Sequence, residues 1–122
     1  VDLGTFTTES CDYPDYAKEV CESVLTINNS LGILICGTGI GMNIAANKIK
    51  NIRCANCCTE YMAAMAKKHN NVNVISIGSR TTSDNLAFDI VKTFINTEFE
   101  AGRHKRRIDK LKQLSANSKN QC

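Results

Sequence analysis

The sequence predicts an α/β fold in three layers, with helices on both faces of a parallel sheet. Short apolar segments alternate with helical patterns along the chain, and helix-capping residues lie between them. Parallel strands need helical crossovers, so this alternation is typical of such a sheet. A chain of 122 residues corresponds to one domain, which we place at residues 1–114, followed by a flexible tail at 115–122.

The first third of the chain predicts one helix and one strand. Residues 1–4 have the pattern of a strand end, and a polar loop follows. We expect Asp12 to cap a helix that has Pro14 in its first turn, where a missing N–H costs nothing. Apolar residues then recur at helical spacing until an Asn-Asn-Ser sequence ends the helix, before a strand at Gly32–Cys36.

The alternation continues to the end of the predicted domain. A short helix is expected at residues 42–48, beginning near Ile40 or Gly41, and two further strands at 52–57 and 72–77. The remaining helices are expected at 60–68 with Thr59 as its cap, at Asp84–Asn96 with Ser83 as its cap, and at 103–114.

The most informative segment covers residues 33–43, where an apolar strand runs into Gly37, Gly39 and Gly41. Such glycines let backbone N–H groups approach a ligand closely, and the helix that follows directs its positive end at the same place. Cys36 is the last residue of the strand, so it lies at the mouth of this site. Positive potential lowers a thiol pKa below its usual value of about 8.5. The segment therefore predicts a reactive cysteine beside an anion-binding turn.

Two other interpretations stay open on these residues alone. A cysteine at a strand end is more often a small apolar core residue. A glycine-rich turn also suggests nucleotide binding, although the spacing here is G-x-G-x-G and not G-x-G-x-x-G. The next strand ends in Asn56-Cys57-Cys58, without the acidic residue that binds a ribose, which disfavours a nucleotide-binding module.

A second strand end points to the same site. Gly78-Ser79-Arg80 follows the expected strand at 72–77, as Cys36 ends the strand before the glycine turn. The carboxyl ends of parallel strands meet at one edge of a sheet, where ligands bind in such folds. We therefore expect these residues to lie together.

Charge and cysteine content exclude several classes. The net charge is only +3, and the basic run at 103–107 lacks aromatic or glycine interleaving, so no nucleic-acid partner is expected. No apolar run reaches the roughly 20 residues of a membrane helix, so no membrane partner is expected. Seven irregularly spaced cysteines indicate a reducing compartment, the cytoplasm. Cys54 and Cys57 have half of a zinc-site spacing without a second pair, which leaves metal as a minor alternative.

Five motifs resemble ribose-5-phosphate isomerase type B, in register from residue 1 to about 114. They are Asp12-Tyr13-Pro14-Asp15-Tyr16-Ala17, the segment 36–48, Lys68-His69-Asn70, Gly78-Ser79-Arg80, and Gly102-Arg103-His104 with Arg107. The resemblance implies a Rossmann-like fold and an aldose–ketose isomerase of the pentose phosphate pathway that uses no cofactor and no metal. Its expected reaction interconverts ribose 5-phosphate and ribulose 5-phosphate. The wider family also contains allose-6-phosphate and galactose-6-phosphate isomerases, which are the alternatives.

The resemblance also implies roles for single residues. Cys36 matches the base that moves a proton between C1 and C2, Thr38 a hydroxyl beside the sugar oxygens, and His69 the histidine that opens the sugar ring. Substrate binding is implied for Tyr13, Gly37, Gly39, Ile40, Gly41, Asn43, Asn70 and Arg80, and phosphate binding for Arg103 and Arg107.

Relatives of this type work as homodimers that complete each pocket across the interface, and some associate further. The resemblance therefore implies a homodimer, or a tetramer, in which the neighbouring subunit supplies His69 and Asn70 and the last helix packs on the partner. The family's opening strand and helix, with an Asp-His pair, have no counterpart in these 122 residues. We expect the sequence to be an incomplete record of a longer protein. A catalytically silent homologue is the alternative.

Overall fold

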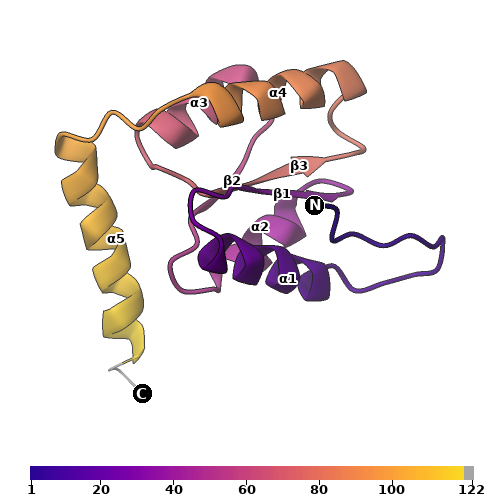
Figure 1. Cartoon of the computed structure of the whole chain (residues 1–122), viewed down its shortest axis with the longest axis horizontal. Coiled ribbons are helices and arrows are strands. Elements are labelled where there is room, and N and C mark those ends of the chain that lie inside the picture. Colours follow the sequence, from indigo (N-terminus) through magenta and orange to yellow (C-terminus); the bar gives the residue numbers. More distant parts are fainter. Residues whose placement is uncertain (120–122) are drawn as a thin grey trace.

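The computed structural model describes residues 1–119. Within this range, five helices and three strands alternate along the chain (Figure 1). Their bounds are α1 Tyr13–Thr26, β1 Gly32–Cys36, α2 Ile40–Asn47, β2 Cys54–Asn56, α3 Glu60–Lys68, β3 Val74–Gly78, α4 Asp84–Asn96 and α5 Arg103–Lys119.

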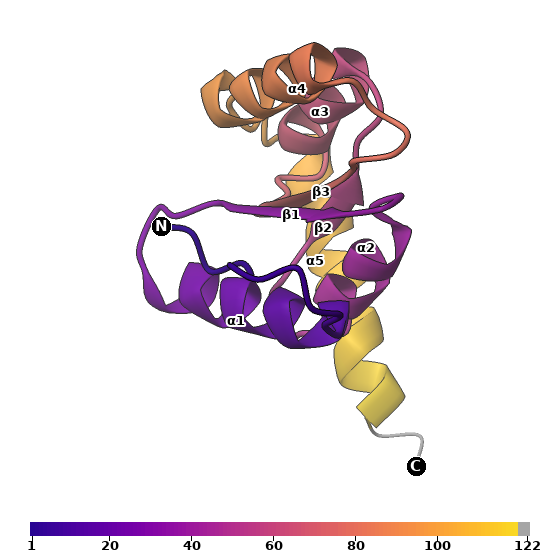
Figure 2. The same ribbon diagram turned by 90° about the vertical axis from the view of Figure 1, so that its right-hand side faces the viewer.

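The three strands form one parallel sheet in the order β1-β3-β2. Helices α1 and α2 lie on one face of this sheet and α3 and α4 on the other, while α5 projects away from the layers (Figures 1 and 2). The predicted three-layer α/β/α architecture is therefore confirmed. None of the described helices is both long and apolar enough to cross a membrane.

The central strand β3 supports the core on both faces, and all five of its residues are buried. Ile75 and Ile77 pack with Phe94 of α4, whereas Val74 packs with Leu34 of β1 on the α1–α2 side. This alternation follows from the two-residue period of a strand. The result is two apolar clusters that hold β3 rigidly between them.

Helix starts agree with the sequence in two of three places. The hydroxyl of Thr59 accepts a hydrogen bond from the Met62 N–H at 3.1 Å, and that of Ser83 accepts one from the Leu86 N–H at 3.3 Å. Asp12 occupies the capping position of α1, but its side chain makes no capping hydrogen bond, so that prediction is wrong. The Asp12 carbonyl instead accepts the Asp15 N–H at 3.2 Å.

Several boundaries differ from the prediction. Residues 1–4 form no strand because no neighbouring strand pairs with them, and the Gly4 N–H bonds the Asp2 carboxylate instead. Strand β2 begins at Cys54, since the Ile52 N–H closes a turn onto the Ile49 carbonyl. Helix α5 continues to Lys119, and residues 120–122 of the predicted tail lie outside the described residues.

Candidate active site at the carboxyl ends of the strands

The turn between β1 and α2 requires glycine at position 39. Gly39 has a φ of +81°, and a Cβ there would collide with Oδ1 of Asn56 and lie 3.0 Å from the Ile77 carbonyl carbon. A larger residue is therefore excluded, and the backbone of the turn stays close to its neighbours. At Gly41 a Cβ would stand 2.7 Å from the exposed ring of Tyr13, which lies against the start of α2.

Cys36 is the one thiol in residues 1–119 whose pKa is shown to be lowered. Burial raises the pKa of its thiol, but the backbone amides of Met42, Gly39, Thr38 and Gly41 more than offset this effect. The Gly39 N–H donates to Cys36 Sγ at 3.2 Å. These donors favour the thiolate because they point toward its charge.

The other core thiols behave in the opposite way. Burial raises the pKa of Cys21 to about 11, of Cys54 to about 12 and of Cys57 to about 11. These thiols stay protonated at neutral pH. Cys54 and Cys57, the half-motif for zinc, belong to no cluster of metal-ligand side chains within residues 1–119.

Open space lies beside the Cys36 sulfur. The residue is partly buried, and it lines a cavity of about 1030 Å³ between β1, α1 and the N-terminal segment. Tyr13 and Met42 line the same cavity. Cys36 also packs against the apolar cluster under α1 and α2, so it combines the contacts of an apolar strand-end residue with access to the cavity.

The predicted meeting of two strand ends is confirmed. The Ser79 N–H donates to the Cys36 carbonyl at 2.8 Å, and the Arg80 N–H donates to the Gly37 carbonyl at 2.9 Å. The Arg80 guanidinium lies against Gly37. We call this set, comprising residues 36–41 with Ser79 and Arg80, the carboxyl edge.

Three other predicted residues follow the turn into α2. The Thr38 hydroxyl accepts the Ile40 N–H at 3.3 Å, and Ile40 itself is exposed. The Asn43 side chain accepts a 3.4 Å hydrogen bond from Asn47, one turn further along α2. Thr38 thus lies at the carboxyl edge, while the Asn43 oxygen is directed along the helix.

His69 and Asn70 lie at the opposite side of the sheet. They follow α3 and precede the amino end of β3, where the Val72 N–H bonds the Ala66 carbonyl. A strand of five residues is about 13 Å from end to end, so β3 separates them from the carboxyl edge. The structure does not bring His69 and Asn70 to Cys36 within one chain.

Helix α5 begins beside His69. The ring of His104 stacks on that of His69 with centroids 4.2 Å apart, and His104 is only 8% exposed. Arg103 and Arg107 are exposed and one helical turn apart. We call His69, Asn70 and the first turns of α5 the amino edge. The sequence motif contained His104, and its spacing of four from Ile108 and seven from Leu111 was the signal that it would share the apolar side of α5.

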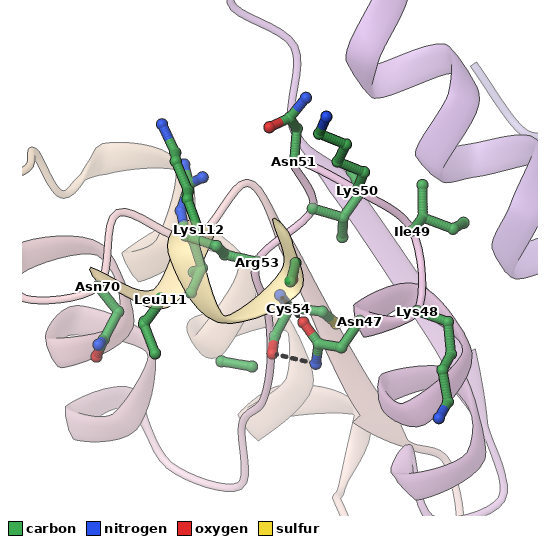
Figure 3. Close-up of a pocket in the computed structure, with 14 residues that line it drawn as sticks. Asn47, Lys48, Ile49, Lys50, Asn51, Arg53, Cys54, Asn70, Leu111 and Lys112 are labelled. Atoms are coloured by element: carbon green, nitrogen blue, oxygen red, sulfur yellow. Dashed lines mark hydrogen bonds between the residues drawn. The ribbon is translucent and has the colours of Figure 1, made fainter. Parts of the chain in front are cut away.

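A groove of about 720 Å³ extends along this amino edge, between α5 and the connection from α2 to β2 (Figure 3). Asn70 and Leu111 lie on one side of it. The cations Lys48, Lys50, Arg53 and Lys112 line the rest. The apolar side of α5 therefore faces an open, positively charged groove.

One group of side chains within residues 1–119 has the composition of a metal site. Ligand atoms of His69, Glu100 and His104 lie within 4.8 Å of one another. However, the two imidazole planes are only 15° from parallel, so their in-plane lone pairs do not converge. The positive charges of Arg103 and Arg107 also act on His104. This electrostatic environment disfavours a cation, and we assign none.

Comparison with known proteins identifies the family. Residues 1–111 match the family model described as Ribose/Galactose Isomerase. Ribose-5-phosphate isomerase B of Escherichia coli is 41% identical over 111 residues, which are 91% of this chain and 74% of that protein.

Solved structures give the same result. Ribose-5-phosphate isomerase B of Clostridium thermocellum superposes with a TM-score of 0.93 at 43% identity, over 97% of this chain and 80% of that one. The Mycoplasma genitalium enzyme, solved with bound ribulose 5-phosphate, gives a TM-score of 0.90 at 42% identity, over 95% and 78% of the two chains. The chain is therefore an isomerase that belongs to the ribose/galactose isomerase family.

Proposed function

We propose that the protein interconverts ribose 5-phosphate and ribulose 5-phosphate. The observation that carries the proposal is the Cys36 thiol, which has a lowered pKa and lines an open cavity beside four backbone donors. An aldose–ketose isomerase needs a base that is ionised near the working pH and donors where negative charge develops. Cys36 and the turn supply both.

The Cys36 thiolate removes the proton from C2 of the open-chain aldose, which leaves an enediolate with its charge on the sugar oxygens. The same thiol then returns a proton to C1, while the proton of the C2 hydroxyl moves to O1, and the ketose results. The backbone N–H groups of Thr38, Gly39, Gly41 and Met42, which face Cys36, are the donors for the developing charge, and the Thr38 hydroxyl lies beside them. Removing one such donor in other enzymes costs about 3–4 kcal/mol of barrier.

The phosphate and the closed sugar ring need further groups beside the Arg80 guanidinium of the carboxyl edge. We assign His69 to ring opening and Arg103 and Arg107 to the phosphate, as the family resemblance implies, with Asn70 beside the sugar. Paired guanidiniums suit a dianionic phosphate because of their matched geometry. Since these residues lie at the amino edge, a second copy of the chain supplies them to each Cys36.

The apolar line of α5 supports that homodimer. Ile108 is buried, whereas Leu111 is 49% and Leu114 is 65% exposed on the same side of the helix. A helix whose apolar side continues beyond its own domain is suited to packing on a partner. The proposed homodimer thus accounts for the two leucines of α5 that a single chain leaves exposed.

The preferred sugar is tested with the full-length product of the gene. We expect turnover of ribose 5-phosphate to exceed that of allose 6-phosphate and galactose 6-phosphate, measured by ketose formation and by loss of C2 deuterium to solvent. A preference for either hexose phosphate would move the protein to that alternative. Absence of turnover and of exchange with all three would support the silent homologue.

A further inference from the structure

The central strand carries a buried hydroxyl that the proposed reaction does not use. Ser76 of β3 is fully buried, on a strand whose other residues are glycine or aliphatic. Its Oγ donates a hydrogen bond to Asn56 Oδ1, at the end of β2, over 3.3 Å. A buried hydroxyl without a partner is costly, so this hydrogen bond fixes the orientation of the Asn56 amide.

The oxygen that Ser76 holds lies directly against the glycine turn. A Cβ at Gly39 would collide with Asn56 Oδ1, and would lie 3.0 Å from the Ile77 carbonyl carbon. The amide oxygen and the β3 backbone therefore occupy the space beneath Gly39. The backbone of the glycine turn therefore cannot move closer to the sheet.

Gly39 in turn contacts the Cys36 sulfur. Its N–H donates to Cys36 Sγ at 3.2 Å, and it is one of the amides that lower the pKa of the Cys36 thiol. Any rotation of the peptide before Gly39 would turn this donor away. A continuous chain of contacts thus runs from Ser76 through Asn56 and Gly39 to Cys36.

From these contacts we propose that Asn56, oriented by Ser76, is a positioning residue that holds the glycine turn so that its amides face Cys36. The inference rests on the proposed role of Cys36 as the base. In this arrangement Asn56 acts on the sulfur through Gly39. The Arg80 guanidinium faces the glycine turn from the turn after β3, and Tyr13 faces it from α1.

The test measures the ionisation of Cys36 directly. Each variant is alkylated with iodoacetamide over a pH series, and the modified Cys36 peptide is quantified by mass spectrometry, with the exposed Cys11 and Cys58 as internal references. In Asn56→Ala we expect Cys36 to react about tenfold more slowly at pH 7, with its pH profile displaced upward. Weakening one hydrogen bond to a charged group corresponds to roughly this factor.

Two further variants locate the effect. Ser76→Ala should displace the profile in the same direction by a smaller factor, because the Ser76 hydroxyl also hydrogen-bonds the Cys54 side chain. The double variant should match Asn56→Ala alone, because the chain of contacts from the hydroxyl to Cys36 runs through the amide. Asn73→Ala is the matched control. Its side chain accepts the Arg53 N–H at 2.9 Å and donates to the Asn51 carbonyl at 3.0 Å, at the other end of the sheet. This variant should lose stability and keep the Cys36 profile.

An unchanged Cys36 profile in folded Asn56→Ala would overturn the inference, as would an equal displacement in Asn73→Ala. If Asn56→Ala does not fold, the profile of Ser76→Ala decides. This test is independent of the proposed isomerase function. If the protein had no isomerase activity, Asn56→Ala would still show the displaced Cys36 alkylation profile.

Discussion

The carboxyl edge and the amino edge are built in opposite ways. The carboxyl edge is held by backbone hydrogen bonds between β1 and the turn after β3, and its key side chain is partly buried. The amino edge consists of side chains at helix ends, with Arg103 and Arg107 exposed on a projecting helix. One protomer can pre-organise the first edge completely. In the proposed homodimer, the second edge becomes part of a binding site when a partner copy faces it.

Loss of the base should give the largest effect. We expect Cys36→Ala to lower kcat by about 10³–10⁴-fold and to abolish proton exchange at C2, because general base catalysis contributes on this scale. Both are measured with ribose 5-phosphate in deuterated water. Cys58→Ala, which removes an exposed thiol, should keep both activities. Exchange at the normal rate in Cys36→Ala would remove Cys36 from its proposed role.

Disruption of the amino edge should come next. Leu111→Glu places a charge on the exposed apolar line of α5, so the dimer should dissociate and activity should fall by about 100-fold. Sedimentation velocity checks the mass, and thermal unfolding checks that the protomer remains folded. Lys110→Glu adds the same side chain at the neighbouring exposed position and should leave the mass unchanged. A monomeric but fully active Leu111→Glu would contradict the need for two copies.

Strain in the glycine turn should have a moderate effect. Gly39→Ala forces a residue with a side chain to adopt the left-handed conformation, and its methyl group would collide with Asn56. We therefore expect the free energy of unfolding to fall by about 2 kcal/mol and kcat to fall about tenfold. Gly102→Ala is the control, since Gly102 has a φ of +59° but nothing within 4 Å of its Cβ position. It should lose stability without any change in Cys36 alkylation. Equal changes of Cys36 alkylation in both variants would contradict the proposal that the conformation of the turn at Gly39 determines the reactivity of Cys36.

The smallest effect concerns pH at the amino edge. Burial, followed by the charges of His69, Arg103 and Arg107, lowers the pKa of His104, whereas Glu100 raises it. The unfolded chain therefore binds a proton more readily, so stability falls as pH drops through the unfolded value of about 6.5 and on through the lower folded value. We expect amides near the start of α5 to exchange hydrogen faster at pH 5 than at pH 7, after correction for intrinsic rates.

His104→Asn should reduce this pH dependence, because it removes the titrating ring. Amides of β3 provide the reference, since that strand is buried at every position. A pH response of equal size in β3 would mean that the whole protein loosens, and not the amino edge alone.

The sequence predicted most of the carboxyl edge because that edge is local. Strand, glycines and helix are consecutive, and the parallel sheet then brings Arg80 to the same place. The caps at Thr59 and Ser83 were predictable for the same reason, as each depends on residues three apart. Asp12 failed because a capping residue type does not ensure that its side chain turns toward the helix.

Contacts across the sheet were not predictable in this way. Asn56 and Ser76 are 20 residues apart, and only strand register places one beside the other. The stacking of His104 on His69 likewise depends on where α5 leaves the domain. The separation of His69 from Cys36 follows from the direction of β3, and the proposal that two copies share one site comes only from the family resemblance.

The most direct test of the shared site mixes two inactive proteins. Cys36→Ala and His69→Ala subunits are dissociated, combined in equal amounts and reassociated. If each pocket takes Cys36 from one copy and His69 from the other, half of the dimers are hybrids with one intact pocket, and activity should recover to about one quarter of the normal value. If both residues served the same pocket within one chain, every pocket would stay damaged and mixing would restore nothing.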